Sequence, residues 1–142
     1  MTRDEVNQYW MLIQKSRYFE DKLKAARIRM ESPRIPELTG QPGSKYPSGS
    51  GSQQERFADA YMDEYDGYLE QLDTTRNEIR RIEDAVNRLP IKEQMVTRWH
   101  CFERLSYKYI ADVMELSITS VSMIQTNAYK LLEEHDGLDT DH

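Results

Sequence analysis

Hydrophobic side chains recur every three or four residues in two long stretches of the chain, which is the period of an amphipathic helix. The first stretch, from about Asp4 to Met30, carries the series Tyr9, Leu12, Ser16, Phe19, Leu23, Ala26 and Met30. The second, from about Gln53 to Leu89, carries Tyr61, Tyr65, Tyr68, Leu72, Thr75, Ile79, Ile82, Val86 and Leu89. Four unbroken heptads in the second stretch are typical of a coiled coil. The pattern predicts two long helices, and Pro90 marks the end of the second.

The segment between these helices lacks the side chains that build a core. Thirteen of the 24 residues from Glu31 to Gln54 are Gly, Pro or Ser, and Ser48–Ser52 alternates Ser with Gly. This composition favours a flexible linker over residues 31–54. A docked loop, held by Ile35, Leu38 and Tyr46, is the alternative.

The two long helices carry opposite charge. Lys and Arg exceed Asp and Glu by four between Tyr9 and Met30, whereas acids exceed bases by six between Glu55 and Asn87. An antiparallel hairpin within one chain would pair these charges. A homodimer through the 61–89 seam is the alternative, but three tyrosines in succession are bulky for a tight two-stranded seam and favour the hairpin.

Shorter amphipathic segments follow Pro90. The pattern predicts helices over residues 91–102, 107–114 and 118–134, and Ser106 and Ser117 are suitable N-caps for the last two. The apolar positions expected to face inward are Ile91, Met95, Val96, Trp99, Phe102, Ile110, Met114, Leu116, Val121, Ile124, Ala128 and Leu131 or Leu132. The chain is therefore expected to be all-α: an N-terminal helix (1–30), the linker, a coiled-coil-like helix (55–89), a helical bundle (90–134) and an acidic tail (135–142).

The spacing within 107–126 is that of a helix-turn-helix. Ala111 supplies the small side chain that two steeply crossing helices need where they touch. The second helix would then present an outer row to the bases in the major groove of double-stranded DNA. The residues of this row are Thr119, Ser120, Ser122, Met123, Thr126 and Asn127.

Charge by segment makes DNA binding plausible in an acidic chain. The 142 residues have a net charge of −6, but residues 88–132 hold six bases and four acids, and residues 133–142 hold five acids. Side chains suited to DNA phosphates are Lys92, Arg98, Arg104, Lys108 and Lys130. The acidic tail is either a solvated end or a mask over this basic region.

A set of residues between 88 and 132 carries a resemblance to a known family. The set is Arg88-Leu89-Pro90, Glu93, Val96, Phe102-Glu103, Leu105-Ser106-Tyr107, Ile110-Ala111, Leu116-Ser117, Ser120-Val121, Ala128 and Leu132. Its order resembles region 4 of sigma-70-type factors. The whole layout is similar to the RinA/ArpU-type late transcription regulators of phages and prophages. This resemblance implies promoter DNA or bacterial RNA polymerase as partner, and activation of late or packaging genes in the cytoplasm of a bacterial host.

Three departures from the resemblance bear on the site. Glu115 stands where the turn usually has a glycine, because that position needs a positive φ angle, and Arg104 replaces another loop glycine. The outer row lacks arginine, so bidentate recognition of guanine is absent and only Asn127 could read adenine. DNA binding is therefore expected to be weak and sensitive to salt.

Other chemistry finds little support. No Cys/His spacing suits zinc, no glycine-rich phosphate loop is present, and no catalytic arrangement can be argued, so we expect no cofactor, no metal and no enzyme. A single cysteine, Cys101, fits a reducing compartment, and no apolar run is long enough to cross a membrane. Two alternatives to a DNA-binding regulator remain: a mimic of region 4 that binds polymerase without reading DNA, and a phage DNA-packaging protein similar to a small terminase subunit.

Overall fold

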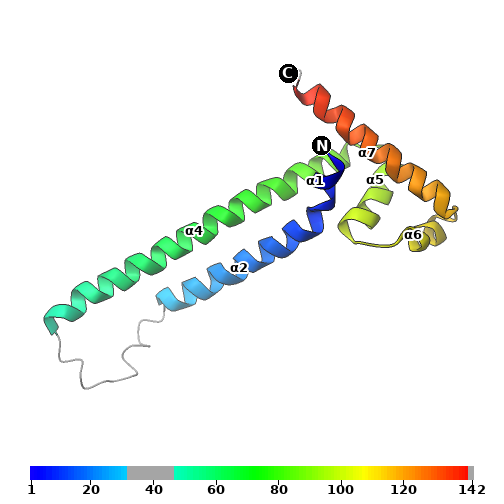
Figure 1. Cartoon of the computed structure of the whole chain (residues 1–142). Helices are drawn as coiled ribbons and strands as arrows, with labels where there is room; N and C mark the ends of the chain where they lie inside the picture. The colour runs from blue at the N-terminus through cyan, green and yellow to red at the C-terminus, as the bar shows by residue number, and fades with distance from the viewer. Residues whose placement is uncertain (32–46, 141–142) are drawn as a thin grey trace. The chain divides into compact units, whose positions relative to one another are not determined.

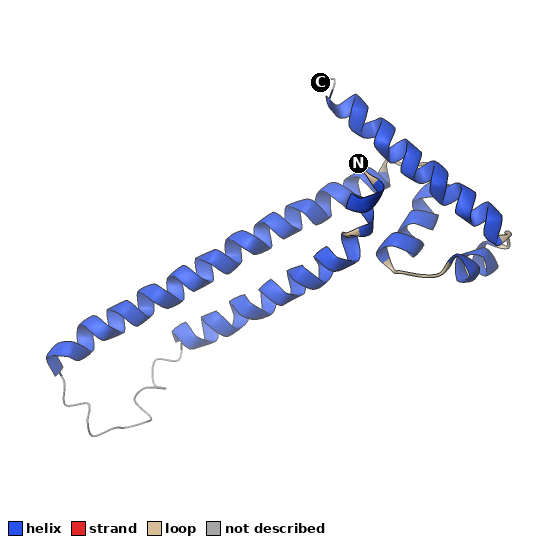
Figure 2. Ribbon diagram, viewed as in Figure 1, coloured by secondary structure: helices blue, strands red, loops and turns tan. Residues whose placement is uncertain are grey.

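The computed structural model describes the backbone of residues 1–31 and 47–140, and the side chains of residues 1–31 and 60–134. Every regular element within these ranges is helical, which confirms the predicted all-α fold (Figures 1 and 2). The elements are α1 (Arg3–Asn7), α2 (Tyr9–Glu31), α4 (Pro47–Asn87), α5 (Ile91–Thr97), the π-helical turn η1 (Arg98–Phe102), α6 (Tyr107–Met114) and α7 (Ile118–Thr140).

Three helix boundaries differ from the predicted ones. The first helix is interrupted at Gln8, so α1 and α2 are separate. Helix α4 begins at Pro47, within the predicted linker, because proline is well suited to a first helical position and elongation adds one hydrogen bond per residue. The rest of that linker, residues 32–46, lies outside the described residues. Helix α7 continues to Thr140, into the predicted acidic tail, since no proline stops it there.

The chain forms two compact units, and the smaller one spans Lys15–Thr74. Within it, Phe19 of α2 and Tyr68 of α4 have ring centroids 6.2 Å apart, and an Arg29 guanidinium nitrogen lies 3.5 Å from a Glu64 carboxylate oxygen. Arg29 follows Phe19 along α2, whereas Glu64 precedes Tyr68 along α4. The two helices are therefore antiparallel. The predicted hairpin within one chain is confirmed, and the Arg29–Glu64 ion pair of this unit is partly exposed and stabilises little.

The larger unit is discontinuous and consists of Met1–Gln14 with Thr75–His142. Its main core joins side chains from both parts, and a second core lies wholly in the C-terminal part. The main core comprises Met1, Val6, Leu12, Ile79, Ile82, Val86, Leu89, Cys101, Phe102, Ala128 and Leu132. The second comprises Val96, Ile110, Ala111 and Val121. Burial of the predicted seam from Leu72 to Leu89 within the chain agrees with the hairpin.

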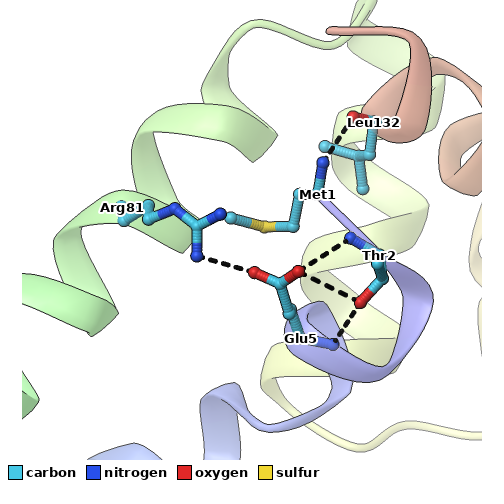
Figure 3. A network of polar contacts seen from close by, with 5 residues as sticks. All are labelled: Met1, Thr2, Glu5, Arg81 and Leu132. Carbon is cyan, nitrogen blue, oxygen red and sulfur yellow. Dashed lines mark hydrogen bonds and ion pairs between the residues drawn. The ribbon is translucent and has the colours of Figure 1, made fainter. Parts of the chain in front are cut away.

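Polar contacts fix α1 against two other helices of the larger unit (Figure 3). Thr2 and Glu5 form a capping box, in which the Thr2 hydroxyl accepts from the Glu5 backbone N–H at 3.2 Å. The Arg81 guanidinium of α4 donates to the Glu5 carboxylate at 2.6 Å, and the Met1 amine donates to the Leu132 carbonyl of α7 at 2.9 Å. Helix α1 therefore has a fixed position beside α7.

Candidate nucleic-acid interface

Both helices of the helix-turn-helix begin where the sequence predicts, and the first also ends there. The Ser106 hydroxyl caps α6 by accepting from the Tyr109 backbone N–H at 3.1 Å. The Ser117 hydroxyl caps α7 in the same way, 3.0 Å from the Ser120 backbone nitrogen. Both serines satisfy helix donors that would otherwise have only water, so the two caps define the turn between the helices.

Among the described residues, two that are not glycine adopt the left-handed conformation, and they are the two at which the sequence departs from the expected glycines. Glu115, the C-cap of α6, has φ 58°, and Arg104, in the loop before α6, has φ 59°. The guanidinium carbon of Arg104 lies 4.7 Å from the centroid of the Trp10 ring. The turn geometry is thus that of a helix-turn-helix, formed with backbone strain at these positions.

The inner face of the motif agrees only in part with the prediction. Ile110 and Val121 are fully buried and Ala111 is 3% exposed. Leu116, predicted to face inward, is 40% exposed, because it follows the left-handed Glu115, where the chain leaves α6. Ile91 at 67% and Met95 at 36% are also exposed, so the inward face of α5 is narrower than predicted.

Some side chains of the predicted base-facing row on α7 are exposed and available, whereas others are half-buried or hydrogen-bonded within the protein. Thr119, Met123, Thr126 and Asn127 are exposed, whereas Ser120 and Ser122 are half-buried. The Ser120 hydroxyl accepts from the Ser117 hydroxyl at 2.9 Å and so belongs to the cap. The Asn127 amide donates to the Glu93 carboxylate of α5 at 3.0 Å. Asn127 must leave Glu93 before it can read a base, which leaves Thr119 and Met123 as the most available side chains.

The five predicted phosphate-facing cations also differ in their surroundings. Lys92, Lys108 and Lys130 are exposed. Arg98 is half-buried: its guanidinium bonds to the Asn87 side-chain oxygen and lies 5.7 Å from the Phe102 ring centroid. Arg104, though exposed, is stacked on Trp10. The lysines are therefore the better candidates for DNA phosphates, and the two arginines have packing roles.

An open cleft of about 470 Å³ lies beside the outer row of α7. Two of its residues belong to the predicted row, one is a predicted phosphate-facing lysine, and one is Arg3 of α1. The lining residues are Arg3, Tyr107, Ser122, Thr126, Tyr129, Lys130 and Glu133. Sequence reasoning missed Arg3, because no local pattern connects it with residues more than 100 positions later.

Buried polar groups near this surface keep their neutral forms. Burial, and then the contact with the Cys101 thiol, raise the pKa of the Tyr129 hydroxyl well above its ordinary value. Burial likewise raises the pKa of Cys101, whose sulfur lies 3.4 Å from the Tyr129 hydroxyl oxygen. The Tyr107 ring stacks on His100, whose Nδ1–H donates to the Leu105 carbonyl at 2.9 Å. These contacts hold the start of α6 in place.

Metal sites and membrane-spanning helices are both absent from the part of the chain that the structure describes. No group of three or more His, Cys, Asp or Glu side chains is placed to hold a metal ion there. No helix among the described residues is both long and apolar enough to cross a bilayer. Comparison with known proteins adds no assignment, since no family model, curated protein or solved structure matches the chain.

Proposed function

We propose that the protein binds double-stranded DNA through its C-terminal helix-turn-helix and regulates transcription. One observation carries the proposal: the capped pair α6 and α7, with its left-handed turn at Glu115, presents an exposed row on the second helix. In this motif the second helix enters the major groove and the first crosses the backbone. Exposed Thr119 and Met123 would then contact base edges, and Lys108 of α6 a phosphate.

The regulated genes follow from the resemblance to RinA/ArpU-type regulators. On this proposal the protein acts at late or packaging-gene promoters of a phage or prophage, with bacterial RNA polymerase as a second partner. The cations available in one protomer support only a few phosphate contacts, which give a modest affinity that falls steeply with salt. Dimerisation would double the contacts.

The test is selection of bound duplexes from random and phage-derived DNA at low salt, followed by titration of the enriched duplex. Lys108→Glu places a negative charge beside the DNA phosphates and is expected to abolish binding. Met123→Glu places a negative charge beside the base edges and is also expected to abolish binding. Lys24→Glu on α2, an exposed lysine of the other compact unit, is the matched control. Absence of any enriched or bound DNA would exclude the proposal.

One observation favours a second candidate, a polymerase-binding protein that does not read DNA. The row on α7 has no charged side chain, Asn127 is engaged with Glu93, and Arg98 and Arg104 lie against aromatic rings. Retention of purified RNA polymerase by immobilised protein, undiminished in Lys108→Glu and Met123→Glu, would support this candidate. Loss of polymerase binding in both variants would oppose it.

A further inference from the structure

Among the described residues that line the cleft beside α7, Arg3 alone comes from outside the C-terminal half of the chain. Its helix is fixed by the capping box and by the Glu5–Arg81 ion pair (Figure 3). The guanidinium carbon of Arg3 lies 5.1 Å from the centroid of the Tyr129 ring, and Asn7, one turn later in α1, donates to the Tyr129 hydroxyl at 3.3 Å. Two residues of α1 thus contact Tyr129, and one of these contacts places Arg3 at the cleft.

The stack on Tyr129 leaves the donors of Arg3 available. A guanidinium carries its five N–H groups in its plane, whereas the contact with an aromatic ring uses its face. A planar fork of donors fits a phosphate, which it can bind with two parallel hydrogen bonds. Lys130 brings a second positive charge to the same cleft.

The remaining lining adds hydroxyl groups and one opposing charge. Ser122, Thr126 and Tyr107 can donate to an anion, although the Thr126 hydroxyl donates to the Ser122 carbonyl in this structure, at 3.0 Å. Burial raises the pKa of the Tyr107 hydroxyl, so it stays protonated at neutral pH. Glu133 opposes an anion, and the charged side chains among the described lining residues therefore sum to one net positive charge.

The position of the cleft indicates that a phosphate bound there would belong to the DNA backbone. Ser122 and Thr126 belong to the outer row of the second helix, and Tyr107 is the first residue of the first helix. A duplex whose major groove holds α7 would carry a strand of its backbone past the start of α6, since the first helix crosses the backbone in this motif. Arginine, lysine, serine, threonine and tyrosine are among the side chains that contact DNA phosphates.

We infer that this cleft holds a backbone phosphate of the bound DNA, gripped by Arg3 and Lys130. The inference rests on the proposed function and extends it, because it makes the N-terminal helix α1 part of the DNA-binding surface. Such a contact fixes the orientation of the protein on the duplex and contributes no sequence preference.

The experiment is a fluorescence-anisotropy titration of a labelled duplex of mixed sequence by the full chain at several salt concentrations. Arg3→Gln and Lys130→Gln are each expected to lower the affinity about tenfold at ~0.1 M salt and to reduce the slope of log K against log salt by about 1. Glu133→Gln removes a repulsive charge and is expected to raise the affinity about two- to fivefold. Lys24→Gln, which removes one charge from the other compact unit, should leave the slope unchanged.

The outcomes separate this inference from the proposed function. If Arg3→Gln and Lys130→Gln bind with the wild-type affinity and slope while Lys108→Glu does not bind, the cleft holds no phosphate and the proposed function stands. If the wild type binds no duplex, both fail. A weaker Arg3→Gln with an unchanged slope and a lower melting temperature would assign Arg3 a structural role and overturn the inference, provided that Lys130→Gln also keeps the wild-type slope.

Discussion

Glu115 and Arg104 occupy backbone conformations that suit glycine, with φ angles of 58° and 59°. For a residue with a Cβ atom this conformation costs about 1 kcal/mol or more, because the Cβ atom crowds the following carbonyl oxygen. The two positions differ in what their side chains contact. Arg104 stacks on Trp10, which offsets part of its strain, whereas the Glu115 side chain is exposed and has no hydrogen bond or ion pair with another described residue to offset the strain.

Glu115→Gly is therefore expected to raise the free energy of unfolding by about 1 kcal/mol. Arg104→Gly should raise it by less, since the guanidinium leaves the Trp10 ring. Urea unfolding followed by circular dichroism measures both values. Glu115→Ala, which keeps a Cβ atom, is the control and should give no gain. An equal gain in Ala and Gly would mean that the side chain of Glu115, rather than its backbone, is unfavourable.

Glu5 makes stability depend on pH. Burial by itself raises the pKa of this carboxyl, but the hydrogen bonds from Arg81 and Thr2 and the Arg81 charge outweigh burial, so the net pKa lies below its ordinary value. The contribution of Glu5 is therefore fully present above the ordinary pKa of glutamate, about 4.3, and is lost as pH falls through the lowered pKa. Unfolding titrations of Glu5→Gln should show a shallower loss of stability below about pH 4.3 than the wild type. Curves of equal slope would contradict this expectation.

At the scale of helices, a buried polar pair joins α5 to α7. Thr97 and Gln125 are fully buried, and the Gln125 amide nitrogen donates to the Thr97 hydroxyl oxygen at 3.2 Å. The amide oxygen of Gln125 has no hydrogen-bond partner among the described residues. A buried acceptor without a partner costs about 1–3 kcal/mol, so this contact positions the two helices at the expense of stability.

A double-mutant cycle tests that account. Thr97→Val removes the acceptor and leaves both ends of the Gln125 amide unsatisfied, so it should lower the free energy of unfolding by about 1–3 kcal/mol. Gln125→Met, similar in length and apolar, removes the unpartnered amide oxygen but also takes the donor from the buried Thr97 hydroxyl, so it should cost less than Thr97→Val. The double variant removes both polar groups and should recover most of the loss of Thr97→Val. Urea unfolding gives all three values. A Gln125→Met variant as unstable as Thr97→Val would show that the amide contributes net stability.

Elements of this fold could be predicted wherever the determining residues lie within a few turns of one another. The caps at Ser106 and Ser117, the range Tyr107–Met114 and the seam from Leu72 to Leu89 all follow from local spacing. The exposure of Leu116 did not follow, because it depends on where the chain turns after Glu115. The buried Gln125 was also missed, since its polarity suggests an outward face and only its packing against Thr97 explains its position.

The candidate site, like the fold, could be predicted only where the residues that determine it lie close together in the sequence. Its base-facing row could be predicted from helical periodicity, whereas the occupied states of Asn127 and Arg104 could not, because their partners Glu93 and Trp10 lie on other helices. Arg3 reaches the cleft only through the folding of α1 beside α7, a contact between the two ends of the chain. Sequence periodicity carries no information about such distant pairs.

At the scale of the molecule, the unit that holds the helix-turn-helix is discontinuous. Met1–Gln14 packs with Thr75–His142, and Tyr9 connects the two parts: its hydroxyl donates to Glu83 at 2.7 Å and its ring lies 3.7 Å from that of Phe102. Burial, followed by this bond to Glu83, raises the pKa of Tyr9 to about 12, so the donor persists at physiological pH. The helix-turn-helix therefore depends on the first residues of the chain for part of its core.

This dependence predicts which part of the chain can be removed. A chain in which a short Gly/Ser loop joins Gln14 to Thr75, in place of Lys15–Thr74, should unfold cooperatively and keep the DNA affinity of the full protein, since it retains every residue of the main core. Residues 75–142 alone lack the buried side chains of Met1, Val6 and Leu12. Burial of one such apolar side chain contributes about 1.5–3 kcal/mol, and the free energy of unfolding of a whole domain is only about 5–15 kcal/mol. That fragment should therefore lose its cooperative transition in thermal melts followed by circular dichroism. If the joined chain and the fragment melt at the same temperature, α1 is not required for the fold. If the joined chain folds well but does not bind DNA, part of the DNA-binding surface lies within residues 15–74.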